Sequence, residues 1–175
     1  MLAEALVIKS PETRGVATTE VKQIVSFEHL EKYYELTRQM LEAGKTEDRV
    51  DLVLAPLEPM NILDKEFLYY SCRQKLDSIK SAFQGKNARI LVIVDGPPQQ
   101  TGPKARFPAL PLLLEFLAEH QLDIIVDDYA RQPEKEMVSE WERILESESL
   151  PHFGEFIEAE KGAYLLAVNR EPQPE

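Results

Sequence analysis

The stretch of sequence that decides the fold is residues 91–111, LVIVDGPPQQTGPKARFPALP. Four apolar residues lead directly into Asp95, and glycines and prolines crowd the eight positions that follow it. An apolar run without alternation is typical of a strand buried on both faces of a parallel sheet. Pro97 and Pro98 disfavour a helix directly after the strand, because the residue before a proline avoids the helical conformation. The stretch therefore predicts a strand that ends in an acid and opens into a stiff loop.

Outward from this stretch, short apolar runs alternate with longer amphipathic segments. The pattern predicts strands at 21–27, 50–57, 88–95 and 122–128, helices at 29–44, 64–87, 107–120 and 134–148, and a closing hairpin at 153–168. Such alternation predicts an α/β fold: a Rossmann-like, mostly parallel sheet with helices on both faces and a C-terminal antiparallel hairpin. We expect a single domain over residues 1–169 and a loose tail at 170–175.

The composition excludes several classes of protein. Of the 175 residues, 43% are hydrophobic and 29% charged, which favours a globular fold. The net charge of −11 argues against nucleic acid and anionic membrane as partners. Cys72 is the single cysteine, no apolar run approaches the ~20 residues of a membrane span, and the N-terminus lacks signal-peptide features. A cytoplasmic protein is expected; its oligomeric state is not specified.

Carboxylates follow three of the four predicted parallel strands. Glu28 follows the first, Asp95 the third, and Asp127 and Asp128 the fourth. Ligands of open α/β sheets bind at this carboxyl edge. Capping of the next helix is an alternative for Glu28, whereas the other three acids have no helix directly after them. Acids without a basic partner in the local sequence usually meet a cation, a hydroxyl-rich ligand or backbone donors.

Two chemical interpretations of these acids stay open. A carboxylate such as Glu28 can accept two hydrogen bonds from vicinal ribose hydroxyls, and Asp95 with Asp127 and Asp128 could hold Mg²⁺. No glycine-rich phosphate loop of the G-x-G-x-x-G or GxxxxGK[ST] type is present, which counts against dinucleotide-binding and P-loop enzymes. The three histidines lack metal-ligand spacing, and both Cys72 and Trp141 are expected in the core.

Several segments resemble the class I S-adenosylmethionine-dependent methyltransferases. They are VSFEHLEKYYELTRQML, EDRVDLVLAPL, ILVIVDGPPQQTGPKARFPALPLLLEFL and DIIVDDYARQPEKEMVSEWERIL. Within that family the chain resembles a bacterial group with EH after the second strand, DGPP…TGP-AR-PALP after the fourth and DD--R after the fifth. The resemblance covers residues 21 to about 168. It implies S-adenosylmethionine as cofactor.

The resemblance also implies roles for individual residues. Glu28, with His29 beside it, matches the acid that binds the cofactor's ribose hydroxyls, and residues Ala55, Pro56 and Leu57 match the turn that borders adenine. Asp95 matches an acid beside the methyl donor and acceptor. In the catechol O-methyltransferase-like branch, acids placed like Asp95, Asp127 and Asp128 hold Mg²⁺. That branch usually has Asp-Asn after the fifth strand, where this chain has Asp-Asp.

The chain departs from the family at its N-terminus. The family's sheet has the order 3-2-1-4-5-7-6, and an E/D-x-G-x-G-x-S loop after the first strand carries the methionine end of the cofactor. This chain opens instead with MLAEALVIKS, which resembles the end of the helix after that loop. Either the chain starts late, or its first 20 residues fill the central gap; ALVIK, residues 5–9, is the candidate strand.

The expected function is methyl transfer from S-adenosylmethionine to an oxygen of a small-molecule acceptor. The transfer is an in-line displacement, so the protein mainly positions the two reactants. Asp95 or a metal ion would orient the acceptor hydroxyl and help to remove its proton. The alternative is a catalytically incompetent or truncated methyltransferase-fold module without its cofactor glycine loop.

Overall fold

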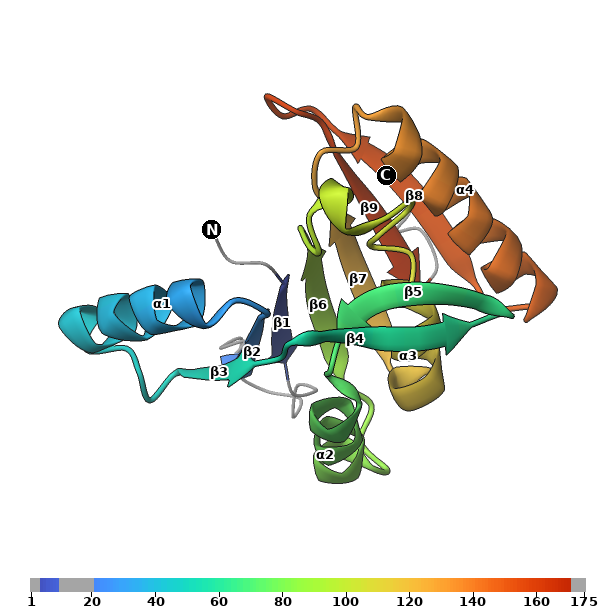
Figure 1. Ribbon diagram of the computed structural model, residues 1–175. Coiled ribbons are helices and arrows are strands. Elements are labelled where there is room, and N and C mark those ends of the chain that lie inside the picture. The colour runs from blue at the N-terminus through green and yellow to red at the C-terminus, as the bar shows by residue number, and fades with distance from the viewer. Residues whose placement is uncertain (1–3, 10–20, 171–175) are drawn as a thin grey trace.

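The structure is a computed structural model that describes the backbone of residues 4–9 and 21–170, and side chains from residue 24 onward (Figure 1). Its strands are β1 Glu4–Lys9, β2 Val21–Glu28, β3 Val50–Leu54, β4 Leu57–Ile62, β5 Lys65–Tyr70, β6 Arg89–Val94, β7 Gln121–Val126, β8 His152–Ile157 and β9 Ala163–Val168. Its helices are α1 Glu31–Gly44, α2 Arg73–Phe83, α3 Ala109–Leu117 and α4 Gln132–Ser147, with a 3₁₀ turn, η1, at Gln99–Thr101.

Seven strands form one sheet in the order β3-β2-β1-β6-β7-β9-β8. The pairs β2–β3 and β6–β7 are parallel, and β9 runs antiparallel to both β7 and β8. Strands β2, β3, β6, β7 and β8 therefore all point in one direction. The predicted α/β class is confirmed: a Rossmann-like, mostly parallel sheet that closes with an antiparallel hairpin.

The segment ALVIK fills the centre of the sheet, as the sequence allowed. It lies in β1, which pairs with both β2 and β6. The backbone N–H and C=O groups along the facing edges of β2 and β6 therefore have hydrogen-bond partners. Both pairings are antiparallel: Glu4 lies opposite Phe27 and Val94, and Lys9 lies opposite Arg89. The amino end of β1 therefore lies at the carboxyl edge, which is the edge of the sheet where β2, β3, β6 and β7 end.

The predicted helix at 64–87 is wrong over its first part. Residues 57–70 form a separate two-stranded sheet, β4–β5, and α2 begins only at Arg73. Leu63 and Asp64 both have positive φ, 48° and 62°, which is the geometry of a tight two-residue hairpin turn. Aromatic and apolar residues then favour β5 as a strand. The other elements agree with their predictions to within a few residues.

The core lies on one face of the sheet. Alternate residues of β6 and β7 face α2, α3 and α4 and join them in one hydrophobic cluster, which includes Trp141 and Cys72 as expected. The residues between them point to the second face and are less covered: Leu91, Ile93 and Ile125 are all partly exposed. In the described part of the chain, three helices therefore cover one face, while the second face keeps apolar side chains in contact with solvent.

Helix α1 lies at one end of the molecule beside β3 and β2, far from α4 (Figure 1). None of its residues is buried. At the C-terminal end, Arg170, the first residue of the predicted tail, is partly buried and pairs with Asp123. The rest of that tail, residues 171–175, lies outside the described residues. No helix in the described ranges is long and apolar enough to cross a membrane.

Candidate functional site

The end of strand β2 carries Glu28, whose carboxylate is only 5% exposed and fixed by the backbone. Its Oε1 accepts hydrogen bonds from the N–H groups of His29 (2.8 Å) and Leu30 (3.0 Å). These donors lie just before α1, whose N-cap residue Leu30 makes no side-chain capping bond, so Glu28 does not cap the helix itself. The same bonds hold the carboxylate in one orientation at the carboxyl edge.

The neighbouring strand end lies directly beside Glu28. The N–H of Ala55 donates to the Glu28 carbonyl at 2.7 Å, and Ala55 is fully buried. Pro56 is exposed, and Leu57 begins β4. The His29 ring meets the Tyr70 ring edge-on, with 5.9 Å between centroids. The five residues that the resemblance assigns to ribose and adenine therefore gather at one place, the ends of β2 and β3.

A second group of acids gathers at the ends of β6 and β7. Asp95, Asp127 and Asp128 each offer one carboxylate oxygen, and these three oxygens lie within 4.8 Å of one another. The N–H of Asp127 donates to the Val94 carbonyl at 3.1 Å, which ties the two strand ends together. We call these three residues the acid cluster. In the sheet, β1 separates it from Glu28.

The acid cluster has a basic partner that the sequence did not indicate. Arg106 is 5% exposed; its Nη1 donates to the Asp127 carbonyl at 3.0 Å, and its Nη2 lies 3.3 Å from Asp128 Oδ2 and 3.5 Å from Asp95 Oδ1. The sequence was interpreted as offering these acids no basic partner in the local sequence; the fold supplies Arg106, and Arg131, three residues after Asp128, also pairs with it. Arg106 follows Asp95 by 11 residues, and the path of the loop brings it back. The only available signal was the basic character of the segment around it.

Burial and charge act in opposite directions on Asp95. Burial raises the pKa of the Asp95 carboxyl, Arg106 lowers it, and the neighbouring Asp127 and Asp128 raise it again; the net result is a pKa above the ordinary value. A carboxylate with a raised pKa is a better proton acceptor near neutral pH.

Asp128 is held by two further cations. Arg131 Nη1 lies 2.9 Å from its Oδ2, and Lys161 Nζ lies 3.6 Å from its Oδ1. Glu134, at the start of α4, is also buried, with Oε1 4.0 Å from Arg106 Nη1.

The loop between β6 and α3 packs against α4. It contains the cis peptide bond Gly96–Pro97 and the short turn η1, and α3 begins at Ala109. Trp141 Nε1 donates to the Phe107 carbonyl at 2.9 Å, and Lys104 pairs with Glu140. The loop is therefore held at several points along its length, as its glycines and prolines predicted.

Two cavities lie near this loop. One, of about 10 Å³, is lined by Pro97, Gln99, Lys104, Ala105, Arg106, Pro133, Glu134 and Met137. The other is an open groove of about 390 Å³ along α4, lined by Lys104, Gln132, Lys135, Glu136, Ser139, Glu140 and Arg143. The groove includes none of the site residues that the sequence indicated.

The acid cluster does not fit Mg²⁺ in this arrangement. Mg²⁺ requires near-octahedral oxygen ligands at about 2.0–2.1 Å. Arg106 contacts two of the three carboxylates and the backbone of the third, and Asp128 has two more cationic neighbours. A metal ion at this place would have to share the carboxylates of Asp95 and Asp128 with the buried guanidinium.

Comparisons with known proteins support the fold. No protein-family model matches the sequence, and no curated protein matches it. The fold is similar to that of an O-methyltransferase from Bacillus cereus in complex with SAH, with a TM-score of 0.53 and 13% identity over 86% of this chain and 64% of that protein. A protein described as a candidate caffeoyl-CoA O-methyltransferase from Staphylococcus aureus has a TM-score of 0.43 and 13% identity, over 82% of this chain and 63% of its own. The chain thus spans slightly less than two thirds of either protein.

Proposed function

We propose that this chain binds S-adenosylmethionine at the carboxyl edge of its sheet and transfers the methyl group to an oxygen of a small-molecule acceptor. The observation that carries the proposal is the placement of Glu28 and Asp95 at this edge. The fold is shared with an O-methyltransferase whose structure contains SAH. The resemblance of the sequence to class I methyltransferases supports the same assignment.

Glu28 is the proposed ribose-binding residue. Its carboxylate is buried and held by the backbone before α1, so little conformational entropy is lost when it accepts hydrogen bonds from vicinal hydroxyls. Ala55 and Leu57, beside it, would border the adenine, and His29 would line the same region. The residues given these roles form one contiguous site, because the backbone N–H of Ala55 donates to the backbone carbonyl of Glu28.

Asp95 is the proposed catalytic residue. The acceptor oxygen forms a bond to the methyl carbon while the bond from that carbon to the sulfonium sulfur breaks, so S-adenosylhomocysteine leaves. The acceptor hydroxyl gives its proton to Asp95, whose raised pKa suits it to accept one. The rest of the acceleration comes from holding donor and acceptor in line.

Calorimetric titration with S-adenosylhomocysteine tests the cofactor site. We expect wild type to bind, and Glu28→Ala to lose about 10- to 100-fold in affinity, since hydrogen bonds to a charged group contribute roughly 1.5–3 kcal/mol. Glu31→Ala removes an exposed acid from the first turn of α1 and serves as the matched control. Unchanged affinity in Glu28→Ala would show that the ribose assignment is wrong.

A second candidate function is a methyltransferase-fold module that does not bind the cofactor. The direction of β1 favours it: because β1 runs antiparallel to β2 and β6, its carboxyl end, Lys9, lies opposite Arg89, at the edge of the sheet away from Glu28 and Asp95. In the family, the glycine loop follows the first strand. If titration of wild type with S-adenosylhomocysteine at high protein concentration releases or absorbs no heat, the result would favour this module over the enzyme.

A further inference from the structure

We infer that the Arg106 guanidinium is the resident cation of the acid cluster, in place of a divalent metal ion, and that it positions Asp95. The guanidinium is 5% exposed and contacts the ends of both central strands. It reaches Asp128 and Asp95 with Nη2 and the Asp127 carbonyl with Nη1, at 3.3, 3.5 and 3.0 Å. One side chain thus touches every member of the cluster.

The charges around the cluster are close to balance without a metal ion. Four carboxylates lie together when Glu134 is included with the cluster, and three cations face them: Arg106, Arg131 and Lys161. Arg106 is the one buried among the three, because the side chains of Arg131 and Lys161 are 42% and 64% exposed. A divalent ion added here would give the site excess positive charge and would lie close to the buried guanidinium of Arg106.

The planar guanidinium also explains how Asp95 is held in place. Nη1 contacts the end of β7, and Nη2 contacts residues after both β7 and β6, so Arg106 connects the loop after β6 to the ends of both strands. Glu134 supports it from α4: its Oε1 lies 4.0 Å from Nη1, while its buried Oε2 has no hydrogen-bond partner among the described residues. Both residues line the cavity of about 10 Å³, which is large enough for about one water molecule that could satisfy Oε2.

Titration with MgCl₂, followed by calorimetry and by the melting temperature, tests this inference on the full chain. We expect wild type to show neither saturable heat nor a rise in melting temperature at millimolar Mg²⁺. Arg106→Gln exposes the carboxylates to a cation, so it should gain Mg²⁺ binding and a Mg²⁺-dependent rise in melting temperature. Arg106→Lys keeps a cation at the site and should remain insensitive to Mg²⁺.

Two controls separate this role from a merely structural one. Arg131→Gln removes a different partner of Asp128 and should not gain a response to Mg²⁺, because Arg106 stays in place. Adding Asp95→Asn to Arg106→Gln should remove the gained response. Loss of packing alone would lower the melting temperature of Arg106→Gln without making it depend on Mg²⁺.

Saturable Mg²⁺ binding by wild type that Asp95→Asn abolishes would overturn the inference. A folded Arg106→Gln protein that ignores Mg²⁺ would also overturn it. If Arg106→Gln does not fold, wild type and Arg106→Lys still test the inference. Mg²⁺ binding by either protein contradicts a resident guanidinium, and absence of Mg²⁺ binding in both supports the inference. No methyl donor takes part in these measurements, so their result is independent of the proposed methyl transfer.

Discussion

The two faces of the central sheet are built from the same strands but are covered very differently. On β6 and β7, the residues that face α2, α3 and α4 are buried, among them Ile90 and Ile124, both fully. Their neighbours Leu91 and Ile125 are equally apolar yet remain partly exposed on the second face. Hydrophobic sequence thus predicts that both faces can be buried, but it does not say what covers them.

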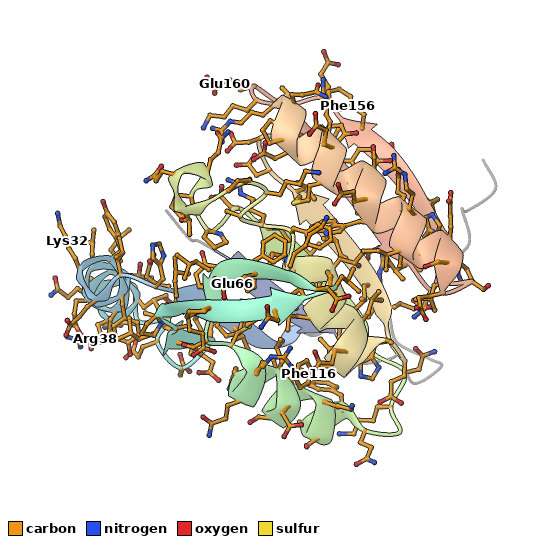
Figure 2. All side chains as sticks on the ribbon, turned by 45° about the vertical axis from the view of Figure 1, so that its right-hand side comes forward. Lys32, Arg38, Glu66, Phe116, Phe156 and Glu160 are labelled. Atoms are coloured by element: carbon orange, nitrogen blue, oxygen red, sulfur yellow. The ribbon has the colours of Figure 1, made fainter. Side chains whose placement is uncertain are left out.

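Helices α4 and α1 show a similar contrast between a covered and an uncovered apolar side. Helix α4 has an apolar side and buries Met137, Val138 and Trp141. Helix α1 is also amphipathic, but Tyr33, at 45%, and Met40, at 67%, are exposed. Lys32 and Arg38 of α1 point away from the rest of the molecule (Figure 2). The amphipathic pattern therefore identified both segments as helices. It predicted a buried apolar side correctly for α4 but not for α1.

The largest expected effect comes from Trp141→Ala on the covered face. The side chain is fully buried, and its indole N–H donates to the Phe107 carbonyl of the loop above the site. The substitution creates a cavity and leaves that carbonyl without its partner, so we expect a loss of about 3–5 kcal/mol in the free energy of unfolding. Urea denaturation measures it, with Trp141→Phe as the milder control. A loss below about 1 kcal/mol would contradict the assignment of this face as the core.

Gly154→Ala should have a smaller but distinct effect at the far edge of the same face. A Cβ atom at Gly154 would lie 1.9 Å from the Tyr164 hydroxyl, which donates to Glu142 at 2.7 Å. The Tyr164 ring must move, which disturbs this bond and its stacking on Tyr129; we expect a loss of about 1–3 kcal/mol in thermal or urea unfolding. Glu155→Ala, at the next position on β8, should be close to neutral. Equal stability of the two variants would show that β8 does not pack under Tyr164.

A pH-dependent effect is expected from His120 on the covered side. The side chain is fully buried beside Phe83, and burial lowers the pKa of its ring. The unfolded chain therefore binds a proton on this histidine below about pH 6.5 while the folded chain resists it, so stability falls as pH decreases from 7 toward 5. In His120→Phe this pH-dependent component of the stability is absent. Melting temperatures measured across this range should fall less steeply in the variant; parallel curves would contradict a buried neutral imidazole.

The smallest expected effect comes from Met40→Ala on α1. Because the side chain is 67% exposed, its removal should change the free energy of unfolding by no more than about 0.5 kcal/mol. The measurement is the urea unfolding used for Trp141→Ala. A loss above about 2 kcal/mol in the free energy of unfolding would contradict the contrast between α1 and α4, since it would mean that this side of α1 is covered in the folded protein.

The sequence predicted the positions of the candidate residues better than it predicted their partners. Glu28, Asp95 and the Asp127–Asp128 pair could be placed at one edge, because the carboxyl ends of parallel strands lie together. Arg106 could not, because its contacts depend on the path of a loop that contains a 3₁₀ turn and several prolines. The hairpin β4–β5 was missed because Leu63–Asp64 carries none of the glycine or asparagine that usually indicates a tight turn.

The sequence by itself determined the alternation of strands and helices, the position of the acids after three of the strands, and the stiff loop after Asp95. These follow from local patterns: apolar periodicity, and the restrictions that proline and glycine place on the backbone. Only the tertiary structure decided that β1 enters the sheet in reverse, that Arg106 lies among the acids, and that one face is covered more fully than the other. Strand direction, long-range ion pairing and burial depend on which distant segments meet, and a local pattern carries no information about that.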